Sequence, residues 1–326
     1  MPYDRHVSTS TLPGGPEPSP SSLTPNALAR AFGLLGDEWN LFLLRYALNG
    51  MTRYSEFSSQ LPISHAVLTA RLERLVEGGL MERREYQQHP PRSEYVLTPA
   101  GRATWPILVA IWTWERRWVS EHSYETPPIH HTRCGNEISP IMTCASCHQQ
   151  IQLQDLTTVW GPSGGWRRSV PQATTRRRSP KRGNAITHTF YPDTMAVYGN
   201  RWSAGVVGAA FIGVKRFTDF EAAMGVPPSL LAERLSALCE HDVLAQTSQA
   251  DRSDWSEYRL TSKGRDFYPV IALTIDWADH WLSEGEGPVF DAVHVPCGST
   301  FHGRLTCDHC NVELAGPDVK LADPSI

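Results

Sequence analysis

The chain lacks any apolar segment long enough to cross a membrane. Its longest charge-free apolar run, residues 202–214, contains 13 residues, whereas a transmembrane helix needs about 20. The N-terminus also lacks a basic stretch followed by an apolar one, so no secretory signal is visible. We therefore expect a cytoplasmic protein with no membrane partner.

The sequence also lacks a recognisable catalytic arrangement. It shows no Ser/His/Asp set, no paired acids and no metal-ligand set with an open position, so we expect no enzyme. Cysteine is scarce, with seven residues in 326. An odd number of cysteines in a chain without an export signal argues against a framework of disulfides.

What the chain does contain is enough apolar sequence for about two domains, with charge distributed unevenly between them. Hydrophobic residues make up 40% of the 326 residues. Residues 26–150 are neutral, residues 151–188 carry a net charge of +6, and residues 189–313 carry −8. A short, strongly basic segment beside an acidic block suggests a polyanionic partner.

The chain aligns with itself at an offset of 163 residues. Residues 36–118 match residues 199–281 without a gap, at 21 of 83 positions. The identities include Trp114 with Trp277. Chance similarity would not keep its register over such a length, so the sequence is a tandem duplication.

The pattern within each repeat predicts a winged helix-turn-helix. In the first repeat, apolar spacing indicates helices over 28–35 and 39–48 and a short helix ending near residue 61. Ser64 would cap the next helix, whose inward face consists of Leu68, Leu72 and Leu75. A β-hairpin over 80–98 and a Trp-rich closing helix over 99–121 would follow.

These segments carry a family resemblance. The order LLGDEWNLFLLRYALNG, TRYSEF, VLTARLERLVEGGLMERR and PPRSEYVLTPAG resembles the HxlR family of bacterial winged-helix regulators. The second repeat is similar through YGNRWSAGVVGAAF, KRFTDF, SLLAERLSAL and SEYRLTSKG. The resemblance implies duplex DNA binding, transcriptional control and dimerisation through terminal helices. Family members often have a Cys ahead of the first helix; Asn26 and Thr189 stand there, so redox sensing by that thiol is not expected.

Six of the seven cysteines belong to a motif that occurs twice, again at the offset of 163. Three thiolates and one imidazole would fill the tetrahedral shell of a structural Zn²⁺, so we expect about two zinc ions per chain, one per repeat. Free thiols or disulfides are the alternative, and His130 or His148 could replace His131. The expected ligands are His131, Cys134, Cys144 and Cys147 in the first repeat, and His294, Cys297, Cys307 and Cys310 in the second.

DNA contacts are expected from the helix that Ser64 caps and from the hairpin. His65 and Thr69 are candidates for reading base edges, although simple solvation of the helix would explain them too. Arg71 could pair internally with Glu94. The remaining candidates for DNA contact are Arg53, Ser64, Arg74, Arg83, Arg84, His89 and Arg92 in the first repeat, and Arg216, Ser229 and Arg252 in the second.

The second repeat should bind DNA less well. Glu233 occupies the position of Ala70, and Asp251 and Asp254 flank Arg252 in its hairpin. It either binds weakly or serves as the pairing partner of the first repeat, with the closing-helix tryptophans between them. Such pairing within one chain would replace a homodimer. The basic residues of 176–182 either lie along DNA or act as a solubilising linker.

Together these observations predict a mainly α protein with small β-hairpins. The expected function is a DNA-binding transcriptional regulator, with repression as its mode, structural zinc sites and duplex DNA as partner; any small-molecule effector is unspecified. The alternative is a protein-interaction scaffold built from degenerate winged helices and zinc knuckles. The expected organisation is a disordered segment (1–25), winged helix-turn-helix domains (26–122 and 189–285), zinc-ribbon-like modules (123–160 and 286–318) and a basic flexible linker (161–188).

Overall fold

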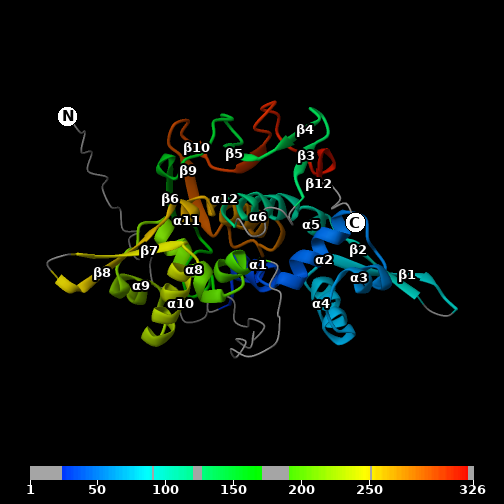
Figure 1. Ribbon diagram of the computed structural model, residues 1–326, viewed down its shortest axis with the longest axis horizontal. Helices are drawn as coiled ribbons and strands as arrows, with labels where there is room; N and C mark the ends of the chain where they lie inside the picture. Colours follow the sequence, from blue (N-terminus) through cyan, green and yellow to red (C-terminus); the bar gives the residue numbers. More distant parts are fainter. Residues whose placement is uncertain (1–23, 90–91, 120–126, 171–190, 250–251, 322–326) are drawn as a thin grey trace.

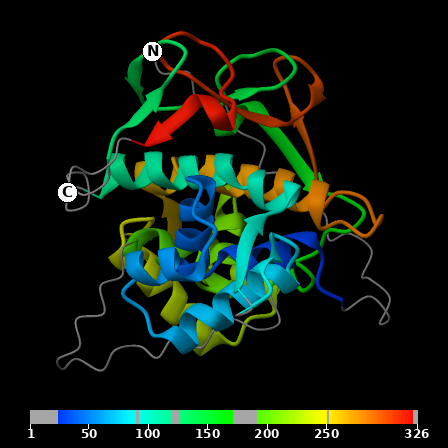
Figure 2. The same ribbon diagram turned by 90° about the vertical axis from the view of Figure 1, so that its right-hand side faces the viewer.

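The computed structural model is built in three layers (Figures 1 and 2). It describes residues 24–89, 92–119, 127–170, 191–249 and 252–321. Small strands form one outer layer, two long helices lie side by side in the middle, and the helix-turn-helix elements form the opposite layer. The expected DNA-binding arm over 176–182 lies outside the described residues, as does nearly all of the segment 1–25.

The first repeat has the expected order of elements. Asp37 caps α2 by accepting hydrogen bonds from the backbone N–H groups of Trp39 and Asn40. The Ser64 side chain caps α4 in the same way at the N–H of Val67, 3.3 Å away. The elements are α1 (Ala27–Leu35), α2 (Glu38–Leu48), α3 (Tyr54–Gln60), α4 (His65–Glu77), β1 (Met81–Gln87), β2 (Arg92–Leu97), α5 (Pro99–Arg102) and α6 (Trp105–Trp118).

The closing helix is broken, which the apolar pattern did not predict. Instead of one helix over 99–121, α5 ends at Arg102 and α6 begins at Trp105. Pro106 stands in the first turn of α6. Proline cannot donate a hydrogen bond to the carbonyl four residues earlier, here that of Arg102, and its ring collides with that carbonyl, so a continuous helix is disfavoured. The break lets Gly101 pack closely: a Cβ there would lie 2.0 Å from the carbonyl oxygen of Leu80.

The second repeat copies this order. Its helix α10 buries Leu231, Leu235 and Leu238, which correspond to the inward face of α4. The elements are α7 (Pro192–Val197), α8 (Arg201–Phe211), α9 (Phe217–Met224), α10 (Pro228–Glu240), β7 (Leu244–Gln249), β8 (Arg252–Leu260), α11 (Ser262–Arg265) and α12 (Tyr268–Trp281).

The two repeats contact each other through their long helices, α6 and α12, and through α1 against α12. The indole N–H of Trp114 donates to the carbonyl of Lys263 at 2.9 Å. The N–H of Trp277, the counterpart of Trp114, donates to the carbonyl of Ala100, the counterpart of Lys263, at 3.0 Å. Such reciprocal contacts are the property of a two-fold interface. Trp114 and Trp277 of the closing helices therefore lie between the repeats, as expected for some of these tryptophans.

The outer layer of strands is shared between the repeats. Its central pair is β5 with β11, in which Met142 lies opposite its own counterpart, Leu305. Beside them, the hydroxyls of Thr143 and its counterpart Thr306 are hydrogen-bonded at 2.8 Å. β3 pairs with β12, and β6 pairs with β9, so each edge also joins one strand from each repeat. The strands are β3 (Ile129–His131), β4 (Asn136–Ile138), β5 (Ile141–Cys144), β6 (Leu156–Trp160), β9 (Phe290–His294), β10 (Ser299–Thr300), β11 (Gly303–Thr306) and β12 (Val319–Leu321).

Within the described ranges, every helix is too short or too polar to cross a bilayer.

Candidate nucleic-acid interface and metal centres

Helices α4 and α10 project from the layer opposite the shared strands, with the hairpins β1–β2 and β7–β8 at the two ends of the molecule (Figure 1). In each repeat this helix packs on the core through three leucines and leaves its other face to solvent. Both helices with their hairpins are therefore presented on one side of the molecule. A duplex could contact them from that side without meeting the strand layer.

The exposed face of α4 carries a hydrogen-bonded polar cluster. The hydroxyl of Tyr54, the first residue of α3, lies 3.1 Å from Nδ1 of His65 and accepts a hydrogen bond from the Thr69 hydroxyl at 3.4 Å. The rings of Tyr54 and His65 are stacked, with centroids 5.9 Å apart. His65 and Thr69 were expected at this place, but Tyr54 was missed. Its signal was its position in TRYSEF, where a half-exposed aromatic begins the short helix.

The arginines around α4 have different surroundings. Nη2 of Arg74 donates to the carbonyl of Gly33 at 2.5 Å, so this side chain ties α4 to α1. Arg71 forms an ion pair with Asp37 at 2.9 Å and not with Glu94, which corrects the expected pairing. Asp37 is the cap of α2, so its carboxylate joins two helices. Arg53 remains exposed, with its guanidinium 5.3 Å from the ring centroid of Tyr86 in the hairpin.

The hairpin of the first repeat brings three arginines to this surface, together with Glu82, Glu85 and Glu94. Four expected contact residues are exposed there, and Arg84 forms an ion pair with Glu82 on the same strand. This pair lies in water, where an ion pair contributes little to stability, so both side chains are free to rearrange. The four residues are Arg83, Arg84, His89 and Arg92.

The second repeat lacks the polar cluster. Phe217, Pro228 and Ala232 stand where the first repeat has Tyr54, His65 and Thr69. Glu233, on the exposed face of α10, forms an ion pair with Arg234 at 2.7 Å. Three expected contact residues remain to be placed: Ser229 is exposed in the first turn of α10, Arg216 is exposed just ahead of α9, and Arg252 begins β8.

The first candidate metal centre contains His131, Cys134, Cys307 and Cys310, whose ligand atoms lie within 4.8 Å of one another. The sulfurs of Cys134 and Cys307 are 3.9 Å apart, and each of Cys134 and Cys310 has its sulfur 3.4 Å from Nδ1 of His131. A tetrahedral Zn²⁺ with Zn–S of about 2.3 Å and Zn–N of about 2.05 Å requires roughly 3.8 Å and 3.6 Å for these separations. The four side chains therefore fit zinc.

The second candidate centre contains Cys144, Cys147, His294 and Cys297. The sulfurs of Cys144 and Cys297 are 4.0 Å apart. Nδ1 of His294 lies 3.4 Å from the sulfur of Cys147 and 3.2 Å from that of Cys297. The same tetrahedral geometry accounts for these separations.

The grouping of these eight side chains differs from the expected one. Each centre takes an HxxC pair from one repeat and a CxxC pair from the other, whereas all four ligands of a centre were expected from one repeat. The reason is the pairing of β5 with β11, which carries each CxxC turn to the HxxC turn of the opposite repeat. His131, not His130 or His148, contributes the imidazole of the first centre.

Local backbone structure favours the thiolate form of one cysteine in each centre, Cys134 and Cys297. Gly135 and Gly298 follow the HxxC turns with φ of +74° and +70°, a conformation that favours glycine. The backbone N–H of Asn136 lowers the pKa of Cys134 to about 6, and that of Ser299 does the same for Cys297. Because the thiolate is the form that binds zinc, N–H groups aimed at the sulfur favour coordination.

The fold and the exposed recognition helices together define a DNA-binding protein with two winged helix-turn-helix domains. The HxlR-like helix-turn-helix family matches the chain twice, over residues 34–123 and 197–286. The chain belongs to this family and holds two copies of its domain.

The chain is also similar to individual proteins. The uncharacterized HTH-type transcriptional regulator Mb3122 of Mycobacterium bovis is 36% identical over 139 residues, covering 42% of this chain and 86% of the relative. An uncharacterized HTH-type transcriptional regulator of Methanothermobacter thermautotrophicus is 36% identical over 97 residues, which cover 29% of this chain and 74% of the relative. The solved structure of PA1374 from Pseudomonas aeruginosa is 31% identical with a TM-score of 0.35, covering 44% of this chain and 97% of that one.

Proposed function

We propose that this chain represses transcription by occupying a duplex operator, which it reads mainly through its first repeat. The HxlR-like domains make it a DNA-binding transcriptional regulator. Repression follows if the operator overlaps a promoter, since two recognition helices on one side of the molecule would cover the duplex.

The observation that carries the proposal is the cluster of Tyr54, His65 and Thr69. A hydrogen-bonded cluster holds its donors and acceptors in place before DNA arrives, so less side-chain entropy is lost on binding. The cluster lies at the N-terminal end of α4. In a recognition helix, the residues at this end contact base edges. Exposed arginines of the adjacent hairpin would contact phosphates and fix the register.

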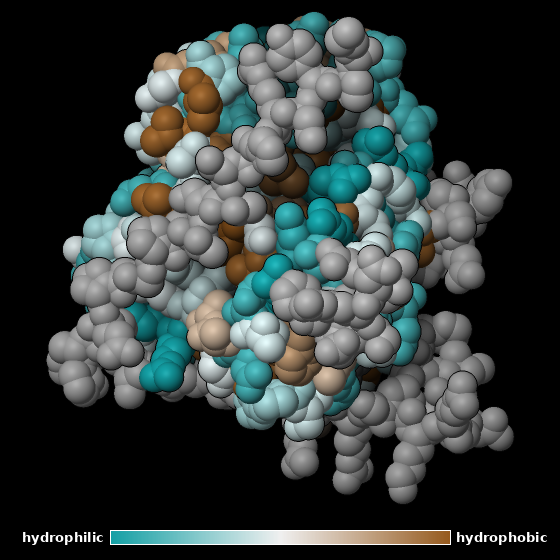
Figure 3. All heavy atoms as spheres, turned by 90° about the vertical axis from the view of Figure 1, so that its left-hand side faces the viewer, coloured by the Kyte–Doolittle hydropathy of each residue, from teal (hydrophilic) through white to brown (hydrophobic). Residues whose placement is uncertain are grey.

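The second repeat would then act chiefly as a support. Its recognition helix presents Glu233 and lacks the polar cluster, and the segment 189–313 carries a net charge of −8. Negative charge near the duplex opposes binding. On the side that Figure 3 shows, hydrophilic and hydrophobic residues are mixed over the described part of the surface.

We also propose that both metal centres hold structural zinc. Each would take three thiolates and one imidazole, which fills the coordination shell and leaves no position for a substrate. Because each centre draws on both repeats, zinc would hold the repeats in one relative orientation. The pair would act as a dimer within one chain, in a cytoplasm that keeps thiols reduced.

The test is DNA binding by variants of the two recognition helices. Fluorescence anisotropy would use a duplex from upstream of the protein's own gene, with an unrelated duplex to measure non-specific binding. Replacing His65 and Thr69 together with Ala should weaken specific binding by about 1–3 kcal/mol for each base that is no longer read. The matched double variant Ser229→Ala with Arg252→Ala should cost less.

Two further results would decide the matter. Tyr54→Phe, which copies Phe217 of the second repeat, should weaken specific binding and leave non-specific binding unchanged. If the Ser229 and Arg252 variant is the more damaging one, the second repeat is the reading head and the proposal is wrong. If the wild-type protein binds its own upstream duplex no more tightly than the unrelated one, the scaffold alternative is favoured.

A further inference from the structure

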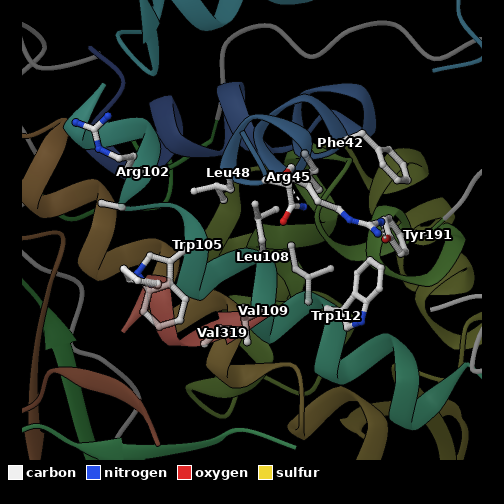
Figure 4. A pocket seen from close by; sticks show the side chains of 16 residues that line it. Phe42, Arg45, Leu48, Arg102, Trp105, Leu108, Val109, Trp112, Tyr191 and Val319 are labelled. Carbon is white, nitrogen blue, oxygen red and sulfur yellow. Dashed lines mark hydrogen bonds between the residues drawn. The ribbon is translucent and has the colours of Figure 1, made fainter. Parts of the chain in front are cut away.

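A cavity of about 520 Å³ opens beside α2 in the first repeat. This volume lies within the range of about 300–1,000 Å³ that is usual for small-molecule sites. Its lining comes from both repeats: α2 and α6 of the first, Tyr191 just ahead of α7, and the segment that leads into β12. Figure 4 shows Phe42, Trp112 and Tyr191 gathered at one end and Trp105 at the other, with Leu108 between them. Most of the wall is therefore apolar, with aromatic rings at both ends.

Arg45 provides a cation in this apolar wall. Its guanidinium carbon lies 4.0 Å from the ring centroid of Trp112, and Nη1 donates a long hydrogen bond of 3.4 Å to the Tyr191 hydroxyl. Its Nε is buried without a hydrogen-bond partner. Over the part of the chain that the structure describes, no acid lines the cavity, although the Glu115 carboxylate acts electrostatically on the same Tyr191 hydroxyl. The second arginine at the cavity, Arg102, instead donates to the carbonyl of Leu97 at 2.6 Å.

Arg45 is half-buried, and a guanidinium with an unpartnered, buried Nε has a desolvation cost that an anion would reduce. Hydrogen bonds to charged groups are the strong ones, and a planar guanidinium binds a carboxylate or sulfonate through two parallel bonds. The neighbouring Tyr191 hydroxyl can join in: burial raises the pKa of Tyr191, so its phenol stays protonated.

At the equivalent positions, the second repeat lacks the arginine and the phenylalanine. Gly208 stands where the first repeat has Arg45, and Gly205 stands in place of Phe42. Trp166 approaches there, with a ring carbon 3.9 Å from the position of a Cβ on Gly208. Trp166 in turn packs edge-on against Trp160, with centroids 4.8 Å apart. The duplicated framework thus carries this arginine in one copy only.

We infer that the cavity binds a small organic anion with an aromatic or aliphatic body, whose carboxylate or sulfonate pairs with Arg45. The body of the ligand lies among the aromatic side chains, and the anionic group meets the guanidinium and the Tyr191 hydroxyl. This site is independent of the recognition helices, so its test does not depend on DNA binding.

The experiment compares two fluorescent probes of similar shape and different charge. One is 8-anilino-1-naphthalenesulfonate, an aromatic anion, and the other is its uncharged relative N-phenyl-1-naphthylamine. The full-length protein should bind about one of either probe in this cavity. Arg45→Met should weaken binding of the sulfonate by at least about tenfold and change that of the neutral probe by less than about twofold. Arg45→Lys should keep a preference for the anion.

Leu108→Trp, which fills the cavity, is the steric control and should reduce binding of both probes. Circular dichroism and the thermal midpoint establish that each variant is folded. The inference is overturned if Arg45→Met leaves sulfonate binding unchanged, or if it weakens both probes equally. It is also overturned if a folded Leu108→Trp protein binds both probes as the wild type does, because the probes then occupy another surface.

Discussion

The crossed grouping of the zinc ligands can be tested by counting metal in two double variants. Cys134 and Cys307 come from different repeats, yet their sulfurs lie 3.9 Å apart in one centre. Cys144 is the repeat counterpart of Cys307, and both are fully buried, but Cys144 belongs to the other centre. Replacing Cys134 and Cys307 with Ser therefore removes two ligands from one centre. Replacing Cys134 and Cys144 removes one ligand from each.

The magnitude follows from the number of ligands that remain. A complete structural zinc site binds with roughly 10–16 kcal/mol at neutral pH. If half of that is lost with two of four ligands, the remaining 5–8 kcal/mol or so corresponds to a Kd between about 1 and 200 µM. The Cys134 and Cys307 variant should thus keep about one zinc ion of wild-type affinity and lose the other. The Cys134 and Cys144 variant should keep no zinc ion that is bound with wild-type affinity.

The assay is elemental analysis after competition with a chromophoric chelator, with the wild-type chain expected to hold about two zinc ions. The opposite pattern, with one strongly bound ion retained only in the Cys134 and Cys144 variant, would show that each repeat binds its own zinc. A native wild-type protein that contains no zinc and presents seven titratable thiols would refute the metal assignment altogether.

Three further predictions concern the hairpin, a half-buried acid and the contact between repeats. Replacing the three hairpin arginines Arg83, Arg84 and Arg92 with Ala should weaken DNA binding and lower the slope of log K against log salt by up to about 2.7 for three phosphate contacts; an unchanged slope would remove the hairpin from the interface. Burial raises the pKa of Asp279 to about 6, so its ionisation destabilises the fold increasingly between about pH 4 and pH 6. Asp279→Asn should therefore raise the thermal midpoint relative to wild type more at pH 7 than at pH 4.5, and an equal shift at both would contradict this. Trp114→Phe removes the donor to a carbonyl of the other repeat and should reduce the free energy of unfolding in urea by about 1–3 kcal/mol; no change would show that this hydrogen bond contributes nothing net.

Local features of the fold could be predicted because they depend on neighbours in sequence. The spacing of Leu68, Leu72 and Leu75 placed one face of α4 in the core, and Ser64 caps that helix as expected. The break after Arg102 was missed although Pro106 was visible, because the apolar period of the closing segment continues through it. Long-range polar partners were not predictable: Arg71 could pair with any nearby acid, and only the packing of α4 on α2 brings it to Asp37.

The DNA-reading surface shows the same division. His65 and Thr69 could be chosen from the sequence because an apolar face on one side of a helix leaves the other side exposed. Their connection through Tyr54 depends on how α3 crosses α4, and periodicity holds no information on that angle. Arg74, expected at phosphates, instead donates to Gly33, since the helix packing brings that carbonyl within reach.

By itself, the sequence determined that the chain is a duplication, that each repeat has the winged-helix order, and that eight side chains form two candidate sets of zinc ligands. These conclusions rest on residue identity and spacing, which are the same whatever the repeats do in space. The tertiary structure decided how the ligands are shared. Each repeat has one HxxC turn and one CxxC turn. An HxxC turn could share a metal with the CxxC turn of its own repeat or with that of the other repeat, and the local turns would be the same in both cases. The pairing of β5 with β11, where Met142 meets Leu305, joins the repeats across a two-fold axis and selects the crossed arrangement.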